Sequence, residues 1–116
     1  MLEASCHCGQ VKLEVDVDVA PTVLTSCNCS ICRRLGTLWC YYTPAQVRVT
    51  GPTATYRWGD NTLDLHRCTT CGCVTHWWPI GESDRMGVNA RLLEPAIVQA
   101  ARIRRFDGAD TWKFLD

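Results

Sequence analysis

The sequence has 116 residues, 47% of them hydrophobic, and this length fits one domain with a small core. Its 12 basic and 12 acidic residues balance, and the sequence pI is near 6.8. This balance argues against a nucleic-acid partner, because such binders usually have a basic stripe and a pI above about 9.

The sequence shows neither a membrane-spanning segment nor an export signal. No apolar run approaches the roughly 18 residues that a membrane helix needs. The first residues lack the basic start and apolar stretch of a signal peptide. We therefore expect one soluble, cytoplasmic domain over residues 1–116, with no membrane partner.

Short β-branched or aromatic segments follow one another along the chain, separated by Gly or Pro. Val11, Leu13, Val15, Val17 and Val19 alternate with polar residues, which predicts a half-buried strand. Further strands are predicted over residues 22–26, 38–43, 47–49, 53–58, 62–67, 74–78, 85–89 and 103–106. Many short strands at such spacings predict a mainly antiparallel β fold.

Turns and helices complete this prediction. Gly59-Asp60-Asn61 separates two of the strands and is a good hairpin signal. Ser30–Leu35 is expected to form one helical turn closed by Gly36. A second helix is predicted over Glu94–Ala101, where Pro95 suits the first turn.

The nine cysteines are the most informative residues. Their odd number and the reducing compartment favour metal ligation over a disulfide framework. Cys40 stands alone. The other eight form three clusters: Cys6-His7-Cys8, Cys27-Asn28-Cys29-Ser30-Ile31-Cys32 and Cys68-Thr69-Thr70-Cys71-Gly72-Cys73.

The pair Cys68 and Cys71, with Gly72 directly after it, is typical of a zinc-binding turn. Structural zinc is almost always four-coordinate, so this pair needs two more thiolates, which either other cluster can supply. Pairing with Cys6 and Cys8 closes one site and leaves the third cluster with three cysteines. Three ligands leave a position open for water or substrate, which is where zinc does chemistry. The count therefore suggests a closed zinc and an open one.

Other interpretations of the third cluster remain open. Cys40 could close its zinc site as a fourth ligand, and so could Asn28 or a water molecule. The cluster could also hold no metal and act as a set of redox thiols. Cys73 is expected to be a small buried or spare thiol rather than a ligand.

In this order and spacing, the clusters resemble the glutathione-dependent formaldehyde-activating enzyme family, which includes the centromere-protein-V-like domains. The resemblance spans roughly residues 2–90. It rests on Cys6-His7-Cys8-Gly9, Cys27-x-Cys29-x-x-Cys32, Cys68-Thr69-Thr70-Cys71-Gly72 and the flanking Cys73-Val74-Thr75-His76-Trp77. The family's middle cluster often reads Cys-His-Cys, and here Asn28 stands in place of the histidine. Asn28 can form hydrogen bonds but cannot take up a proton near neutral pH.

The resemblance implies a twisted antiparallel fold of the Mss4-like type. It implies a carbon–sulfur lyase that condenses formaldehyde with glutathione to S-(hydroxymethyl)glutathione. It also implies two zinc sites: a structural one on Cys6, Cys8, Cys68 and Cys71, and a labile, catalytic one on Cys27, Cys29 and Cys32.

An open zinc site suits such a reaction, because coordination deprotonates a thiol. Arg33 and Arg34, beside the third cluster, could bind a carboxylate of glutathione, and Trp77 could wall a pocket with Trp39, Tyr41 and Trp78. Two alternatives stay open: a non-enzymatic zinc module for protein interaction or metal handling, and a thiol redox protein. The sequence predicts no oligomeric state.

Overall fold

The alternating segment after the first cysteine cluster forms the middle of a small sheet. The computed structural model describes residues 1–116. Val11, Leu13 and Val15 are completely buried, whereas Lys12 between them is exposed, as the alternation of side chains along a strand requires. The three strands are antiparallel and follow the order β1 (Leu2–Ser5), β2 (Lys12–Val15) and β5 (Val47–Thr50).

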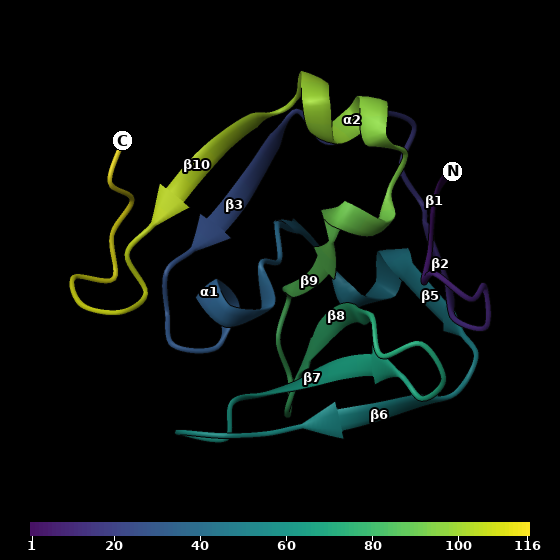
Figure 1. Ribbon diagram of the computed structural model, residues 1–116, viewed down its shortest axis with the longest axis horizontal. Helices are drawn as coiled ribbons and strands as arrows, with labels where there is room; N and C mark the ends of the chain where they lie inside the picture. Colours follow the sequence, from purple (N-terminus) through teal and green to yellow (C-terminus); the bar gives the residue numbers. More distant parts are fainter.

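The second sheet is larger and has seven strands (Figure 1). Its order is β10 (Arg102–Phe106), β3 (Val23–Cys27), β4 (Trp39–Tyr42), β9 (Met86–Asn89), β8 (Val74–Pro79), β7 (Leu63–Cys68) and β6 (Thr53–Tyr56). β6 and β7 form the hairpin predicted around Gly59-Asp60-Asn61. The prediction of a mainly β fold with antiparallel sheets is therefore confirmed, with one exception at the edge.

The exception is the last strand, because β10 runs parallel to β3, with Phe106 opposite Cys27. Parallel neighbours need a crossover connection, and the helix α2 (Pro95–Ala100) lies directly before β10. This helix was predicted from the sequence, and Pro95 occupies its first turn. Because β3 and β10 run in the same direction, the segments that follow these two strands begin side by side, at the C-terminal ends of the strands.

The remaining elements are short. The predicted helical turn near the third cysteine cluster is α1 (Cys32–Leu35), and it ends at Gly36. Two single 3-10 turns are η1 (Pro44–Gln46), between β4 and β5, and η2 (Ala90–Leu92), between β9 and α2. None of the helices has the length and apolarity that crossing a membrane requires.

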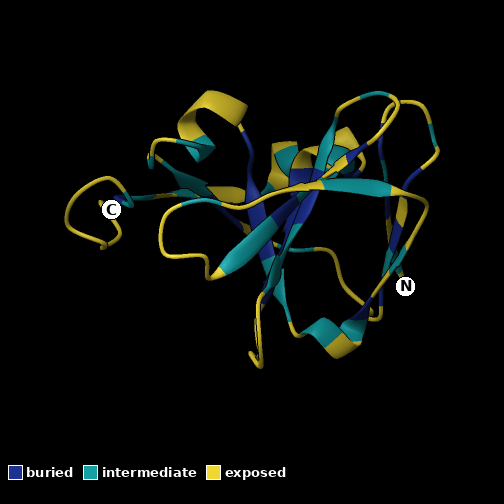
Figure 2. Ribbon diagram, turned by 90° about the horizontal axis from the view of Figure 1, so that it is seen from below, coloured by how far each residue is buried: buried dark blue, intermediate teal, exposed yellow.

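Both sheets contribute to one buried cluster. Leu13 of β2 belongs to it together with Leu24 of β3 and Val88 of β9. Figure 2 shows the buried stretches in the middle of the molecule and exposed ones on its periphery, including the loop before the C-terminus. Cys6 and Cys68 are part of the same cluster, so the first cysteine group lies at the border of the core.

Candidate metal centres and the pocket beside one of them

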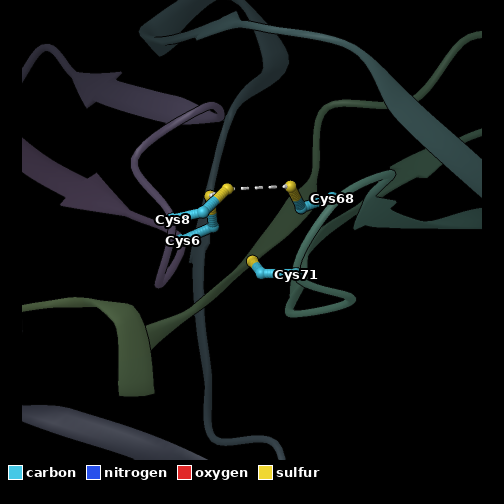
Figure 3. A group of neighbouring side chains, drawn as sticks. All are labelled: Cys6, Cys8, Cys68 and Cys71. Atoms are coloured by element: carbon cyan, nitrogen blue, oxygen red, sulfur yellow. Dashed lines mark hydrogen bonds between the residues drawn. The ribbon is translucent and has the colours of Figure 1, made fainter.

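The first cysteine group joins the two sheets. Cys6 and Cys8 lie in the turn that follows β1, whereas Cys68 ends β7 and Cys71 lies in the next turn. The four sulfur atoms all lie within 4.8 Å of one another, with 3.6 Å between the sulfurs of Cys8 and Cys68 (Figure 3). We call these residues the four-cysteine group. They link segments 60 positions apart in the sequence.

The surroundings of this group suit thiolates. The backbone N–H of Val11 donates to the sulfur of Cys6 at 3.3 Å, and that of Thr70 donates to the sulfur of Cys68 at 3.4 Å. A backbone hydrogen bond from Cys73 lowers the pKa of Cys71 to about 5. Four sulfur ligands in one place are the donor set that tetrahedral Zn²⁺ prefers. The residues therefore fit a closed zinc site.

The second group consists of Cys27, Cys29 and Cys32, whose sulfurs also lie within 4.8 Å of one another. We call it the three-cysteine group. Cys27 ends β3, Cys29 lies in the following loop and Cys32 begins α1. No fourth cysteine, histidine or carboxylate lies within that distance of all three. The group could hold a metal ion, and its protein ligands number three.

Hydrogen bonds converge on these three sulfurs as well. The backbone N–H of Cys29 donates to Cys27 at 3.5 Å, and the indole N–H of Trp39 donates to Cys32 at 3.4 Å. A hydrogen bond from Cys32 lowers the pKa of Cys27 to about 5. The same hydrogen bond, together with burial, raises the pKa of Cys32. At neutral pH the group therefore favours a thiolate at Cys27, the state in which cysteine binds metals or acts as a nucleophile.

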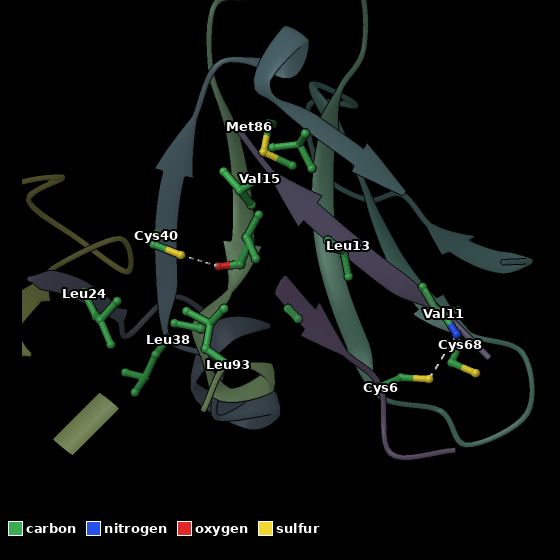
Figure 4. Packing of buried hydrophobic residues seen from close by; sticks show 14 residues of the cluster. Cys6, Val11, Leu13, Val15, Leu24, Leu38, Cys40, Cys68, Met86 and Leu93 are labelled. Atoms are coloured by element: carbon green, nitrogen blue, oxygen red, sulfur yellow. Dashed lines mark hydrogen bonds between the residues drawn. The ribbon is translucent and has the colours of Figure 1, made fainter. Parts of the chain in front are cut away.

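The structure places the two other cysteines outside both groups. Cys40 is buried in the core, where its sulfur donates to the backbone carbonyl of Val88 at 3.5 Å (Figure 4). Cys73 is partly buried and packs against the core. Cys40 therefore does not join the three-cysteine group, and the side-chain amide of Asn28 is hydrogen-bonded to Asp107 and Ala109.

Asn28 binds the segment that follows β10, residues 107–114, which we call the C-terminal loop. Its side-chain carbonyl accepts a hydrogen bond from the backbone N–H of Ala109 at 3.0 Å. Gly108 passes so close to the three-cysteine group that a β-carbon there would lie 2.6 Å from the sulfur of Cys27. The loop therefore packs directly against this group, and glycine is the residue that allows the approach.

A cavity of about 550 Å³ opens beside the three-cysteine group, and all three of its cysteines line it. We call it the aromatic pocket. Its charged lining residues are Asp84 and Arg85, and the guanidinium of Arg85 lies 3.8 Å above the centre of the Tyr41 ring. Most of the other lining side chains are aromatic, namely Trp39, Tyr41, Trp58, Trp77, Phe106, Trp112 and Phe114.

The predicted substrate-binding residues are distributed unevenly around this pocket. Trp77 lines it, and its indole lies so close to Gly87 that a side chain there would collide with it. Arg33 and Arg34 lie on the exposed helix α1 and do not line the pocket. The guanidinium of Arg34 donates to the carbonyl of Ser30 at 2.6 Å.

Several lining residues were missed by the sequence analysis. Arg85 was assigned only to a strand, and Trp112 and Phe114 were not assigned at all. Their alternation near the C-terminus was a signal of one apolar face, but nothing in the sequence tied that face to Cys27. Only the parallel pairing of β10 with β3 brings them together.

These observations define a small, mainly β protein with two cysteine clusters that could bind zinc. The model of the glutathione-dependent formaldehyde-activating enzyme family matches residues 1–103, and the chain belongs to this family. Membership supports a glutathione-dependent formaldehyde-activating function at the level of the family.

A solved structure supports the same fold. A crystal structure of a Rhodobacter sphaeroides protein, determined by structural genomics, superimposes with a TM-score of 0.74 at 29% sequence identity. The match covers 88% of this chain and 99% of that chain. No curated protein matches this chain.

Proposed function

We propose that this chain is a carbon–sulfur lyase that uses zinc and acts on glutathione adducts, with formaldehyde plus glutathione as the reference reaction. One observation carries the proposal: the three-cysteine group, with three protein ligands, forms part of the wall of the aromatic pocket. A ligand set that is incomplete and faces a cavity is the arrangement of a zinc site that binds substrate. Family membership supplies the substrate class.

The two cysteine groups have different roles in this proposal. Cys6, Cys8, Cys68 and Cys71 hold a structural zinc that fastens the two sheets together. The second zinc belongs to Cys27, Cys29 and Cys32, which are the catalytic ligands. Bound there, zinc supplies one kind of chemistry, which is to keep a coordinated substrate thiol deprotonated at neutral pH. In this proposal residues 1–116 form a single domain. Its expected location is the cytoplasm, where the reducing environment keeps cysteine thiols from forming disulfides.

The reaction places simple demands on the other residues. A bond forms between the sulfur of glutathione and the carbonyl carbon, and the thiol proton ends on the carbonyl oxygen. Burial raises the pKa of Tyr41, against a hydrogen bond from Thr25, so its hydroxyl stays protonated at neutral pH. We assign this hydroxyl as the hydrogen-bond donor to the substrate oxygen, because Tyr41 and the three cysteines line the same pocket.

Glutathione also needs a partner for its carboxylates. Arg85 is the one cation that lines the pocket, and none of the ion pairs in the structure involves it. A guanidinium can bind a carboxylate through two parallel hydrogen bonds. We assign Arg85 to this contact, with Trp77 as an apolar wall. Arg33 and Arg34 stay a prediction from the sequence.

The test measures zinc and turnover on the full chain. Elemental analysis of the purified protein should give two equivalents of zinc, one for each cysteine group. Exchange NMR should show faster interconversion of free formaldehyde and S-(hydroxymethyl)glutathione when the protein is added. Cys29→Ala should lose one zinc and the acceleration, whereas Cys40→Ala, outside both groups, should keep both. Wild-type protein with two zincs and no acceleration would contradict the proposal.

A further inference from the structure

The aromatic pocket has a wall that lies beyond the part of the chain shared with the family. The family match ends at residue 103. Phe106, Trp112 and Phe114, all after that point, line the pocket. The rings of Trp112 and Phe114 each lie 5.1 Å from the ring of Phe106 in edge-to-face arrangements. The chain therefore adds three packed aromatic rings to a site whose cysteines belong to the family pattern.

The added wall is held in place by several contacts. The backbone N–H of Asp107 donates to the carbonyl of Lys113, and that of Trp112 donates to the carbonyl of Asp107, both at 2.8 Å. The side chain of Asn28 holds the same loop from the other side through Asp107 and Ala109. The loop is thus fixed at both of its ends and against the three-cysteine group.

Trp112 is the unusual member of this wall. Its φ of 59° lies in the left-handed region, which non-glycine residues seldom adopt and which is often found at functional sites. Its side chain is 70% exposed, although it lines the pocket. A large indole held in a strained conformation and left in solvent gains apolar burial when a ligand covers it.

The lining of the pocket does not match the smallest substrate of the family. Formaldehyde has no apolar surface to bury, and the peptide part of glutathione is polar and charged. Yet, besides the three cysteines, nine of the 15 lining residues are aromatic or aliphatic. A binding site gains affinity and specificity by burying surface that complements its own. The seven aromatic rings favour a substrate that carries an apolar group close to the glutathione sulfur.

We infer that the preferred substrate is the adduct of glutathione with an aromatic aldehyde, whose ring lies between the C-terminal loop and the opposite wall of the aromatic pocket. This rests on the proposed function and adds the class of aldehyde. In the direction that forms the adduct, the thiol sulfur bonds to the aldehyde carbon, the carbonyl π bond breaks and the thiol proton ends on the oxygen; cleavage of the adduct reverses each of these changes. The product is a hemithioacetal, and nothing is oxidised or reduced.

Two stable thioethers test the inference without turnover. S-benzylglutathione carries a phenyl ring on the carbon next to sulfur, where the hemithioacetal of benzaldehyde has it, and S-methylglutathione lacks the ring. Titration calorimetry on the full, zinc-supplied chain should show at least about tenfold tighter binding of the benzyl compound. Quenching of tryptophan fluorescence provides a second readout.

Variants locate the ring. Trp112→Ala should bring the ratio of the two dissociation constants close to one, and Leu115→Ala, in the same exposed segment but outside the pocket, should leave it unchanged. Trp58→Ala, which removes a lining ring that lies outside the C-terminal loop, provides the same test if circular dichroism shows that Trp112→Ala is unfolded. Equal affinities of the two thioethers for wild-type protein would overturn the inference and leave the proposed function standing if formaldehyde exchange is still accelerated. An unchanged ratio in Trp112→Ala would also overturn it.

Discussion

The side-chain amide of Asn28 donates a hydrogen bond to a carboxylate oxygen of Asp107 at 3.0 Å, across 79 positions of the sequence. This bond and those from Thr111 hold the pKa of Asp107 below its usual range. Asn28 stands where the family pattern often has histidine. It uses both ends of its amide, one to donate to Asp107 and one to accept from Ala109.

We expect Asn28→Ala to release the C-terminal loop while the fold stays intact. Removing the amide leaves the Asp107 carboxylate without one donor and the Ala109 N–H without its acceptor. Hydrogen exchange should become faster at the amides of Ala109 and Thr111, and binding of S-benzylglutathione should weaken. Ser30→Ala, at an exposed neighbouring position, is the control. Equal exchange in the two variants would show that Asn28 does not hold the loop.

Gly108→Ala should weaken metal binding at the three-cysteine group. The new methyl group would lie 2.6 Å from the sulfur of Cys27 and 3.2 Å from the β-carbon of Cys29, so either the loop or the ligands must move. Competition with a coloured chelator should show one zinc released more easily and the other unchanged. Ala109→Ser, one residue further along, should release both zincs as the wild type does.

The four-cysteine group should determine stability, and the three-cysteine group should not. Structural zinc contributes on the order of 10 kcal/mol to the folding of small zinc domains. Cys68→Ser removes a ligand at the border of the core and should leave the protein unfolded or insoluble. Cys29→Ser, at a half-buried loop position, should keep a thermal midpoint near that of the wild type. Equal midpoints for the two variants would contradict this division.

The buried histidine predicts how stability varies with pH. Burial lowers the pKa of His76 to about 3, and its ring stacks on that of His66 with 4.3 Å between centres. The unfolded chain takes up a proton near pH 6.5, but the folded one does not until about pH 3. Below pH 6.5 the unfolded state therefore binds more protons, and stability falls as pH falls.

This contribution reaches about 1.4 kcal/mol for each pH unit below 6.5 and ends near the folded pKa. Urea unfolding of wild type and of His76→Gln is measured at pH 7.5, 6.0 and 5.0. The difference between the two proteins isolates the contribution of His76, because both share the effect of acid on the cysteine groups. The wild type should lose more stability than the variant between pH 7.5 and 5.0. Parallel losses in the two proteins would show that His76 does not carry the dependence.

Arg85 and Arg33 are alternative partners for a carboxylate of glutathione, and we expect only the substitution of Arg85 to weaken binding. Arg85→Ala removes the one cation that lines the aromatic pocket and should raise the dissociation constant of S-methylglutathione by about tenfold, as loss of a charge-assisted hydrogen bond would. Arg33→Ala, on the exposed helix α1, is the matched control and tests the assignment made from the sequence. A larger effect of Arg33→Ala would move the carboxylate contact to α1.

The elements that the sequence predicted well carry their signal locally. Alternation at Val11, Leu13 and Val15 identifies one face of β2, and the glycine-containing turn identifies the hairpin of β6 and β7. The spacing of Cys68 and Cys71 indicates a ligand pair in the same way. Strand β1 was missed, because Leu2–Ser5 is too short and too mixed in composition to show a period.

What the sequence left open depends on pairing between distant segments. Nothing within residues 103–106 indicates that this strand runs parallel to β3. That one pairing decides which residues face Cys27, and with it the aromatic lining from Trp112 and Phe114. Arg33 was a reasonable choice of cation because it is next to Cys32 in the sequence. Arg85 lies in the connection between β8 and β9, and only the fold brings it to the pocket.

The folded-back C-terminal loop also affects aggregation. β10 is an outer strand of the seven-stranded sheet, and an outer strand with free N–H and C=O groups is a template for pairing with another chain. Phe114 forms an antiparallel bridge with Phe106, and the N–H of Leu115 donates to the carbonyl of Arg105. The last residues thus occupy part of that edge. Shortening the chain after Phe106 would leave the edge open and should favour self-association during expression and storage.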